Sequence, residues 1–188
     1  MFEQFEWVGH DLYASGAVSS HGGNLSARLD GERMLITRTG SMIGRLTPAD
    51  IIETSLVECG DPRDAECSVE LVVHRAIYAA TGARAIVHAH AIQTVARAFV
   101  DDVIVPLDSE SKLRLTDVSV IVASEVIGSA EAGELLAASL VDRRIAVLRT
   151  HGPFARGESL EDAYQAVSCL EASCAVLNAL DAMGRPLR

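Results

Sequence analysis

Two histidines spaced two apart, His88 and His90, give the first chemical signal in this 188-residue chain. The run 85–89 is short and mostly apolar, which favours a β-strand. In a strand, side chains two residues apart project from the same face, so both imidazoles can reach one metal ion. The alternative is a pair of hydrogen-bonded polar residues at a strand end. The motif is therefore moderately specific and predicts a metal site.

A third histidine, His151, follows the apolar run 145–148, which is typical of a buried strand. The next residue, Gly152, lets the backbone turn away from the strand end. Taken alone, such a histidine is more often a loop residue. Taken together, three strand-end histidines are what an open catalytic zinc site requires, with a fourth position left for water or substrate.

The helix predicted over 68–80 carries two further polar candidates. Glu70 lies in its first turn, with Ser68 as the N-cap, so Glu70 is either a carboxylate stabilised by the helix dipole or a metal ligand and proton-transferring base. His74 lies on the same face one turn later. It can bond Glu70 or join the metal, but a satisfied core histidine is the favoured interpretation.

Two short loops supply flexible backbone and small hydrogen-bond donors, namely Gly22-Gly23-Asn24 and Thr39-Gly40-Ser41. Such loops can form amide nests for a phosphate, although most are only turns. The chain has no GxxxxGK[ST] and no GxGxxG after a strand, which removes the usual nucleotide-binding interpretations. It also has no GxSxG nucleophile elbow, so a serine hydrolase is not expected.

The composition limits the classes of protein that this chain can represent. Its length favours one domain, spanning 1–188. With 16 Lys and Arg against 26 Asp and Glu, its net charge of -10 argues against nucleic-acid binding but not against a small phosphorylated substrate. No apolar run is long enough for a membrane span, and no signal peptide is recognised. The 4 cysteines show no CxxC spacing, so we expect a cytoplasmic protein with free thiols.

The order of the expected elements indicates an α/β fold. We expect helices at 2–15, 68–80, 92–99, 129–140 and 160–180, a helix start at 47–50, and strands at 25–29, 33–37, 51–58, 85–89, 103–107, 118–122 and 145–148. Asp30-Gly31 predicts a hairpin between the first two strands. A hairpin followed by interspersed helices favours a mixed sheet between helical layers over a simple doubly wound parallel sheet.

Read in order, four stretches resemble the class II aldolase/adducin family, and in particular its fuculose-phosphate-aldolase-like enzymes. They are HGGNLSAR (21–28), LITRTGSMIGRLTPADII (35–52), SVELVVHRAIYAATGARAIVHAHAIQTVARA (68–98) and LRTHGPFARGESLEDAY (148–164). The resemblance implies an α/β/α-layered fold around a central, mostly antiparallel mixed sheet. It also implies a homotetramer with active sites at subunit interfaces.

The resemblance further implies roles for single residues. His88, His90 and His151 match the family's zinc-binding histidines, with one ion per subunit and manganese or cobalt as alternatives. Glu70 matches a glutamate that acts as a metal ligand at rest and as the acid/base when substrate displaces it. The positions that match the phosphate-binding residues are Gly23, Asn24, Thr39, Gly40 and Ser68.

The implied activity is a zinc-dependent aldolase that reversibly cleaves a ketose 1-phosphate, such as fuculose 1-phosphate or a short deoxyketose phosphate. The products are dihydroxyacetone phosphate and an aldehyde, formed through a metal-stabilised enediolate. No Schiff-base lysine is needed, which suits a chain whose only lysine is Lys112. The alternatives are a relative that uses the same metal as an epimerase, dehydratase or decarboxylase, and a non-enzymatic assembly module like the adducin head.

Three departures from the family pattern bear on the substrate. Val69 stands where many members have a second serine, which removes one hydroxyl from the expected phosphate site. Arg38 stands where many have a proline, as a replacement charge or simply an exposed arginine. The segment 103–111 lacks the tyrosine that fuculose-type enzymes use there, which leaves Asp108 or Glu110 as the candidate proton donor to the leaving aldehyde.

Overall fold

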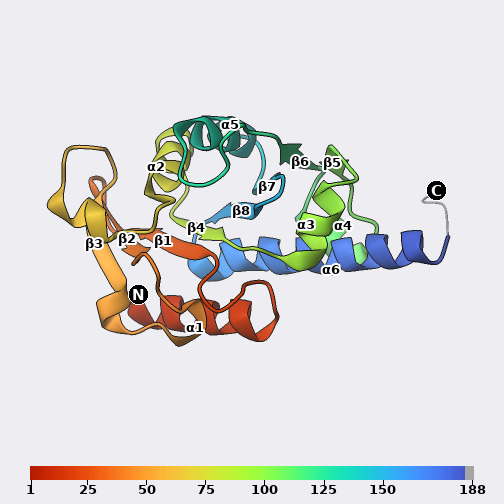
Figure 1. Ribbon diagram of the computed structural model, residues 1–188, viewed down its shortest axis with the longest axis horizontal. Helices are drawn as coiled ribbons and strands as arrows, with labels where there is room; N and C mark the ends of the chain where they lie inside the picture. The colour runs from red at the N-terminus through yellow and green to blue at the C-terminus, as the bar shows by residue number, and fades with distance from the viewer. Residues whose placement is uncertain (185–188) are drawn as a thin grey trace.

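A single eight-stranded sheet runs through the computed structural model of the chain, which describes residues 1–184 (Figure 1). The strands are β1 (Asn24–Arg28), β2 (Arg33–Thr37), β3 (Ile51–Ser55), β4 (Ala85–His88), β5 (Val103–Ile104), β6 (Val118–Ile121), β7 (Ile145–Leu148) and β8 (Gly152–Gly157). Their order across the sheet is β3-β2-β1-β4-β8-β7-β6-β5. All neighbouring strands are antiparallel except β6 and β7.

Helices cover both faces of this sheet. On one face lie α1 (Phe2–Ala14), α3 (Ile92–Ala98), α4 (Ser109–Arg114) and α6 (Leu160–Ala182), and on the other lie α2 (Leu71–Ala80) and α5 (Ala130–Leu140) (Figure 1). Successive residues of a strand face opposite ways, so Val87 packs in the core under α6 while Ile86 packs in the core under α2. The expected α/β/α architecture with a mostly antiparallel mixed sheet is confirmed.

Three single-turn 3-10 helices link the outer strands, namely η1 (Ile43–Arg45), η2 (Pro48–Asp50) and η3 (Pro62–Glu66). The expected helix start at 47–50 is confirmed as η2. There the Asp50 carboxylate accepts hydrogen bonds from the backbone N–H and the hydroxyl of Thr47, at 2.8 and 2.7 Å. The expected strand 51–58 ends earlier, at Ser55, because the chain leaves the sheet toward η3.

Several predicted boundaries were wrong, and one α-helix and one strand were not predicted, nor were the short η1 and η3. The helix expected over 68–80 begins at Leu71, so Glu70 rather than Ser68 occupies the N-cap position. The strand expected over 103–107 ends at Ile104, before Pro106, whose nitrogen cannot donate to a strand. The helix α4 and the central strand β8 were missed. β8 begins with Gly152 and Pro153, a sequence that alone signals a turn.

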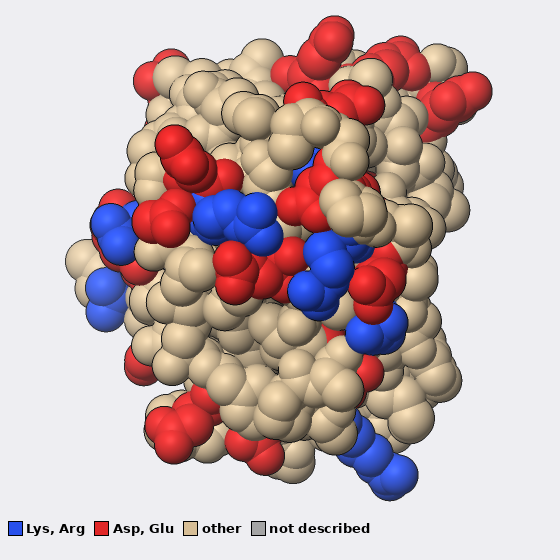
Figure 2. Space-filling view, turned by 90° about the vertical axis from the view of Figure 1, so that its left-hand side faces the viewer, with Lys and Arg blue, Asp and Glu red and all other residues tan. Residues whose placement is uncertain are grey.

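Arginines and carboxylates alternate over the face formed by β2, β3 and η3 (Figure 2). The least exposed of these pairs joins α2 to η3. Arg75 donates to both carboxylate oxygens of Asp64, at 2.9 and 2.8 Å, and to the backbone oxygen of Ser55. Thr54 also donates to Asp64. This pair anchors the connection that leads from η3 into the residues before α2.

Within residues 1–184, no helix combines the length and the apolar character that crossing a membrane requires.

The Asp64 pair predicts a pH-dependent stability. Burial alone would raise the pKa of the Asp64 carboxyl, but hydrogen bonds from Arg75 and Thr54 and the charge of Arg75 outweigh it and lower that pKa below its usual 3.8. A lowered pKa stabilises the fold above the unfolded value and loses this effect as the pH falls through the folded value. We expect Asp64→Asn to lower the free energy of unfolding by about 1–2 kcal/mol at pH 7.

Chemical denaturation at pH 7 and at progressively lower pH measures this difference. The difference in free energy of unfolding between wild type and Asp64→Asn should decrease once the pH falls below 3.8. The exposed pair of Asp117 and Arg143 offers a matched control, and Asp117→Asn should change stability little at any pH. A difference for Asp64→Asn that persists in acid would contradict the assignment.

Candidate functional site

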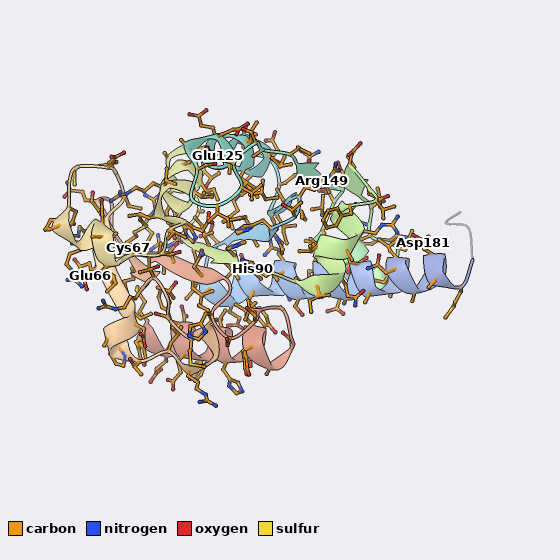
Figure 3. All side chains as sticks on the ribbon, in the orientation of Figure 1. Glu66, Cys67, His90, Glu125, Arg149 and Asp181 are labelled. Carbon is orange, nitrogen blue, oxygen red and sulfur yellow. The ribbon has the colours of Figure 1, made fainter. Side chains whose placement is uncertain are left out.

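The three histidines expected to bind metal meet where β4, β7 and β8 lie side by side. His88 ends β4 and His90 lies two residues beyond it, near the middle of the molecule (Figure 3). His151 lies in the turn between β7 and β8. One ring nitrogen from each lies within 4.8 Å of the others. The Nε2 atoms of His88 and His90 are 3.0 Å apart, near the roughly 3.3 Å between two nitrogens on one tetrahedral zinc ion.

The ring of His88 is held in one orientation by its surroundings. Its Nδ1–H donates to the backbone oxygen of Pro153 at 3.0 Å, so the lone pair on its Nε2 points toward the other two histidines. Phe154 stacks on the same ring with centroids 3.9 Å apart. Both residues belong to β8, so the missed strand supplies the support for the metal-binding histidine.

Glu70 lies beside the histidines with only 2% of its surface exposed. Its Oε1 accepts a hydrogen bond from the backbone N–H of Gly128 at 3.1 Å and lies 3.3 Å from Nε2 of His151. The last contact is close, but its geometry is not that of a hydrogen bond, because Nε2 of His151 has no partner within the described residues. The other Glu70 oxygen, Oε2, is also buried without a partner. A divalent cation would satisfy both atoms, so the residues fit a metal.

Burial and mutual repulsion favour the neutral forms of His88 and His90. The pKa of His88 lies well below its usual value because of burial, with the nearby His151 and His90 as further causes. The pKa of His90 is lowered by burial and by His151, against an opposing effect of Glu70. Neutral imidazole is the form that binds a metal ion, so the site needs little proton release from these rings near neutral pH.

Two glycines permit the strands to approach around the histidines. Gly152 has a φ of +145°, and a Cβ there would lie 2.1 Å from the backbone oxygen of Ala89. Gly23 has a φ of +79°, and a Cβ there would lie 2.7 Å from the backbone oxygen of His88. In both places the obstacle is backbone, which cannot move aside without separating the metal-binding segments.

A cavity of about 200 Å³ joins the histidines to the two glycine loops. The residues predicted for metal and phosphate all line it, namely Gly23, Asn24, Thr39, Gly40, Ser68, Glu70, His88, His90 and His151. Ser68 and Glu70 come from the residues that precede α2, and Asn24 begins β1. The structure therefore brings together segments that are more than a hundred residues apart in the sequence.

Five more residues line this cavity, namely His21, Arg38, Ser41, Val69 and Ile127. Arg38 is engaged by its neighbours, since it donates to the backbone oxygen of Ala49 and pairs with Glu66 at 2.9 Å. Val69 and Ile127 are 62% and 63% exposed and give the rim an apolar side. No sequence signal pointed to Ile127 or to the backbone donor Gly128, because a loop residue that contributes through position carries no chemical signature.

The two residues considered as proton donors lie elsewhere in the chain. Asp108 is the N-cap of α4, where its carboxylate accepts from the backbone N–H of Ser111 at 2.8 Å. Glu110, in the first turn of the same helix, lines a separate cavity next to α1 and α6. Within one chain, neither residue lines the cavity of the three histidines.

Comparison with known proteins agrees with this site. Residues 3–177 match the family described as the Class II Aldolase and Adducin N-terminal domain. The chain belongs to the class II aldolase and adducin family. Class II aldolases depend on a metal ion, which accords with the three-histidine cluster. The fold of this class II aldolase-like chain is similar to that of L-fuculose-1-phosphate aldolase from Thermus thermophilus, with a TM-score of 0.90, 38% identity, and coverage of 99% of this chain and 97% of that one.

Relatives in the family carry names of different reactions. A 3-oxo-tetronate 4-phosphate decarboxylase of Haemophilus influenzae is 31% identical, over 83% of this chain and 76% of that protein. A probable bifunctional methylthioribose-1-phosphate isomerase/methylthioribulose-1-phosphate dehydratase of Nocardia farcinica is 31% identical over 87% of this chain. The class II aldolase-like chain spans only 33% of that longer protein. Each of these names includes a phosphorylated sugar derivative, but the names describe different reactions.

The turn that carries His151 predicts a stabilising substitution. Thr150, an exposed β-branched residue, has a φ of +71°, a conformation that costs about 1–2 kcal/mol for most residues. Asparagine tolerates this conformation, so Thr150→Asn should raise the free energy of unfolding by about 1 kcal/mol. Denaturation with zinc content held equal measures the change. Thr116→Asn, at an exposed position of negative φ, is the control. An equal gain in stability there would show that the positive φ of Thr150 is not the cause.

The three-histidine cluster predicts stoichiometric metal binding. Purified protein should hold about one zinc ion per chain, and His88→Ala should hold far less because one ligand and its fixed Nε2 lone pair are lost. Elemental analysis after dialysis against trace zinc measures this. His10→Ala removes an exposed histidine of α1 and should leave the zinc content unchanged. Equal zinc in His88→Ala and wild type would rule out this metal centre.

Proposed function

We propose that this protein is a zinc-dependent aldolase that reversibly cleaves a ketose 1-phosphate into dihydroxyacetone phosphate and an aldehyde. The observation that carries the proposal is the single cavity of about 200 Å³, which is lined at once by three histidines, by Glu70 and by the small donors of two glycine loops. Carbonyl chemistry on a phosphorylated sugar needs a cation, a proton-transferring group and an anion site within one small molecule's length.

His88, His90 and His151 would hold the ion. Glu70, whose Oε1 lies 3.3 Å from Nε2 of His151, would complete the set at rest. Three imidazoles and a carboxylate favour zinc over the harder ions that prefer oxygen alone. A bound divalent ion supplies a Lewis acid that polarises a carbonyl oxygen and stabilises the negative charge that develops on it.

Glu70 is the residue that we assign to proton transfer. Its Oε2 has no hydrogen-bond partner, while the N–H of Gly128 holds Oε1 in place. A carboxylate with one oxygen tethered and the other free is oriented without being blocked. Once protonated, Glu70 can deliver that proton to the carbon that carries negative charge after the carbon–carbon bond breaks, and its carboxylate can remove the proton again in the condensation direction.

The glycine loops would bind the phosphate. Gly23, Asn24, Thr39, Gly40 and Ser68 offer backbone N–H, amide and hydroxyl donors to the same cavity. Local donors matter here because the chain carries a net charge of -10, which repels a phosphate at long range. Arg38 adds a nearby positive charge, although Glu66 partly neutralises it.

We also propose that the protein acts as a cytoplasmic homotetramer with sites at subunit interfaces. Within one chain, Asp108 and Glu110 lie outside the cavity. Only from a neighbouring subunit could either donate a proton to the aldehyde oxygen in condensation, or accept it from the C4 hydroxyl when the aldehyde leaves. The second candidate function is a dehydratase or decarboxylase with the same metal and the same phosphate site. The apolar rim of Val69 and Ile127 and the names of the relatives support this second candidate.

Condensation of dihydroxyacetone phosphate with a panel of small aldehydes tests the proposal. Wild-type enzyme loaded with zinc should consume dihydroxyacetone phosphate with at least one aldehyde. Glu70→Gln should lose roughly 100-fold or more in turnover, because a general acid/base contributes about 10²–10⁴, while it keeps part of its zinc. Near-normal turnover in Glu70→Gln would leave Glu70 as a structural residue at the start of α2.

The same panel separates the two candidate functions. No condensation with any aldehyde, together with water loss or carbon dioxide release from a phosphorylated sugar or sugar acid, would favour the second candidate. His10→Ala serves again as the control, since its zinc content and its turnover should both match wild type.

A further inference from the structure

Four polar side chains form a buried hydrogen-bonded series that runs from the cavity into the contact between β1 and α2. In linked order they are Asn24, His74, Ser26 and Tyr78, and we call them the Asn24–Tyr78 chain. Nε2 of His74 lies 2.5 Å from Oδ1 of Asn24, and its Nδ1 lies 2.6 Å from Oγ of Ser26. The hydroxyl of Tyr78 lies 2.9 Å from the same Oγ.

The burial of this chain means that each of its polar atoms must be paired. His74 and Ser26 are completely buried, and Asn24 and Tyr78 are 6% and 3% exposed. Burial lowers the pKa of His74 to about 3, so its ring is neutral and carries one N–H. A neutral imidazole donates from one nitrogen and accepts at the other. The chain therefore has a direction, which the end residues decide.

Tyr78 decides this direction. Within residues 1–184, its hydroxyl has Ser26 as its hydrogen-bond partner and no other. Tyr78 must donate to Ser26, Ser26 must donate to Nδ1 of His74, and Nε2–H of His74 must donate to Oδ1 of Asn24. In the reverse direction the buried Tyr78 hydroxyl would have no acceptor, which is costly.

Arg28 keeps Tyr78 in place at the far end of the chain. Its guanidinium lies 5.1 Å from the centre of the Tyr78 ring and donates to the backbone oxygen of Tyr78 at 3.1 Å. The hydroxyl is thereby directed at Ser26 on the neighbouring strand. The direction of the Asn24–Tyr78 chain is thus set by a residue at the end of α2, remote from the cavity.

The consequence appears at Asn24, the only member of the chain that lines the cavity. Because Oδ1 is occupied by His74, the amide is oriented with Nδ2 as its remaining polar atom. Within the described residues Nδ2 makes no hydrogen bond, yet it is not enclosed as a buried unpaired atom. Its two N–H donors are therefore available to a ligand that only accepts hydrogen bonds.

We propose that His74, Ser26 and Tyr78 are positioning residues that fix the Asn24 amide with its NH₂ group toward the cavity, as a donor to a phosphate oxygen of the substrate. This inference rests on the proposed function, in which Asn24 belongs to the phosphate site. It also explains why His74 is fully buried close to the proposed metal centre without being one of its ligands.

Binding of inorganic phosphate to the zinc-loaded protein, measured by calorimetry, tests the role of His74. His74→Leu removes the Nε2–H that holds Oδ1 of Asn24, so the Asn24 amide can turn its oxygen to the cavity. Phosphate affinity should fall roughly three- to tenfold. Tyr164→Phe, at a half-buried tyrosine of α6, should leave affinity unchanged.

A double-mutant cycle with Asn24→Ala separates positioning from a general structural effect. Asn24→Ala alone should weaken phosphate binding about tenfold or more. In the Asn24→Ala background, His74→Leu should have less than a roughly twofold effect, because the two residues act through one amide. An equal factor in both backgrounds would overturn the positioning role. Unchanged affinity in Asn24→Ala would instead remove Asn24 from the proposed phosphate site.

The tautomer of His74 gives a readout that needs no variant and no ligand. Nitrogen NMR of protein labelled in histidine distinguishes a protonated from an unprotonated ring nitrogen. In wild type, Nε2 of His74 should carry the proton and Nδ1 should not. A wild-type ring protonated at Nδ1 would overturn this inference. It would not affect the proposed aldolase function, because the aldehyde panel tests that function separately.

Discussion

The structure depends on a carboxylate and an imidazole that are buried next to each other with polar atoms left unpaired. Glu70 and His151 lie where the two hydrophobic cores approach the sheet, and each has one atom without a hydrogen-bond partner. Such atoms are costly in a protein interior unless a cation or a ligand satisfies them. Both atoms lie beside the three-histidine cluster, where the proposed metal ion would satisfy them.

Backbone geometry keeps this arrangement in place. The oxygen of Pro153 orients His88, and the N–H of Gly128 holds Glu70. The absence of a side chain at Gly152 lets the segment of His151 lie against the segment that follows His88. None of these contributions depends on the chemistry of a side chain. They arise because β4, β8 and β7 are neighbours in the sheet.

The same arrangement explains how one family can include several reactions. The three histidines lie at or just beyond the ends of β4 and β7, and Glu70 lies at the start of α2, where packing on both sides restricts change. The rim of the cavity includes Arg38, Val69 and Ile127, which are half-buried or exposed and can change without disturbing the core. In the proposed function, the fold would fix the metal site and the proton-transferring group, whereas the rim and neighbouring subunits would select the substrate and the bond that breaks.

The sequence by itself predicted the strongly patterned elements and the three histidines that the structure brings together. Arg33–Thr37 alternates and follows a turn signal, and His88 and His90 have the spacing of a strand face, so local rules sufficed. Only the tertiary structure decided that Gly152–Gly157 is a central strand, because its hydrogen-bond partners, β4 and β7, outweigh a local glycine and proline. It likewise decided that His74 orients Asn24, since the hydrogen-bonding direction of a neutral ring depends on partners about fifty residues away in the sequence.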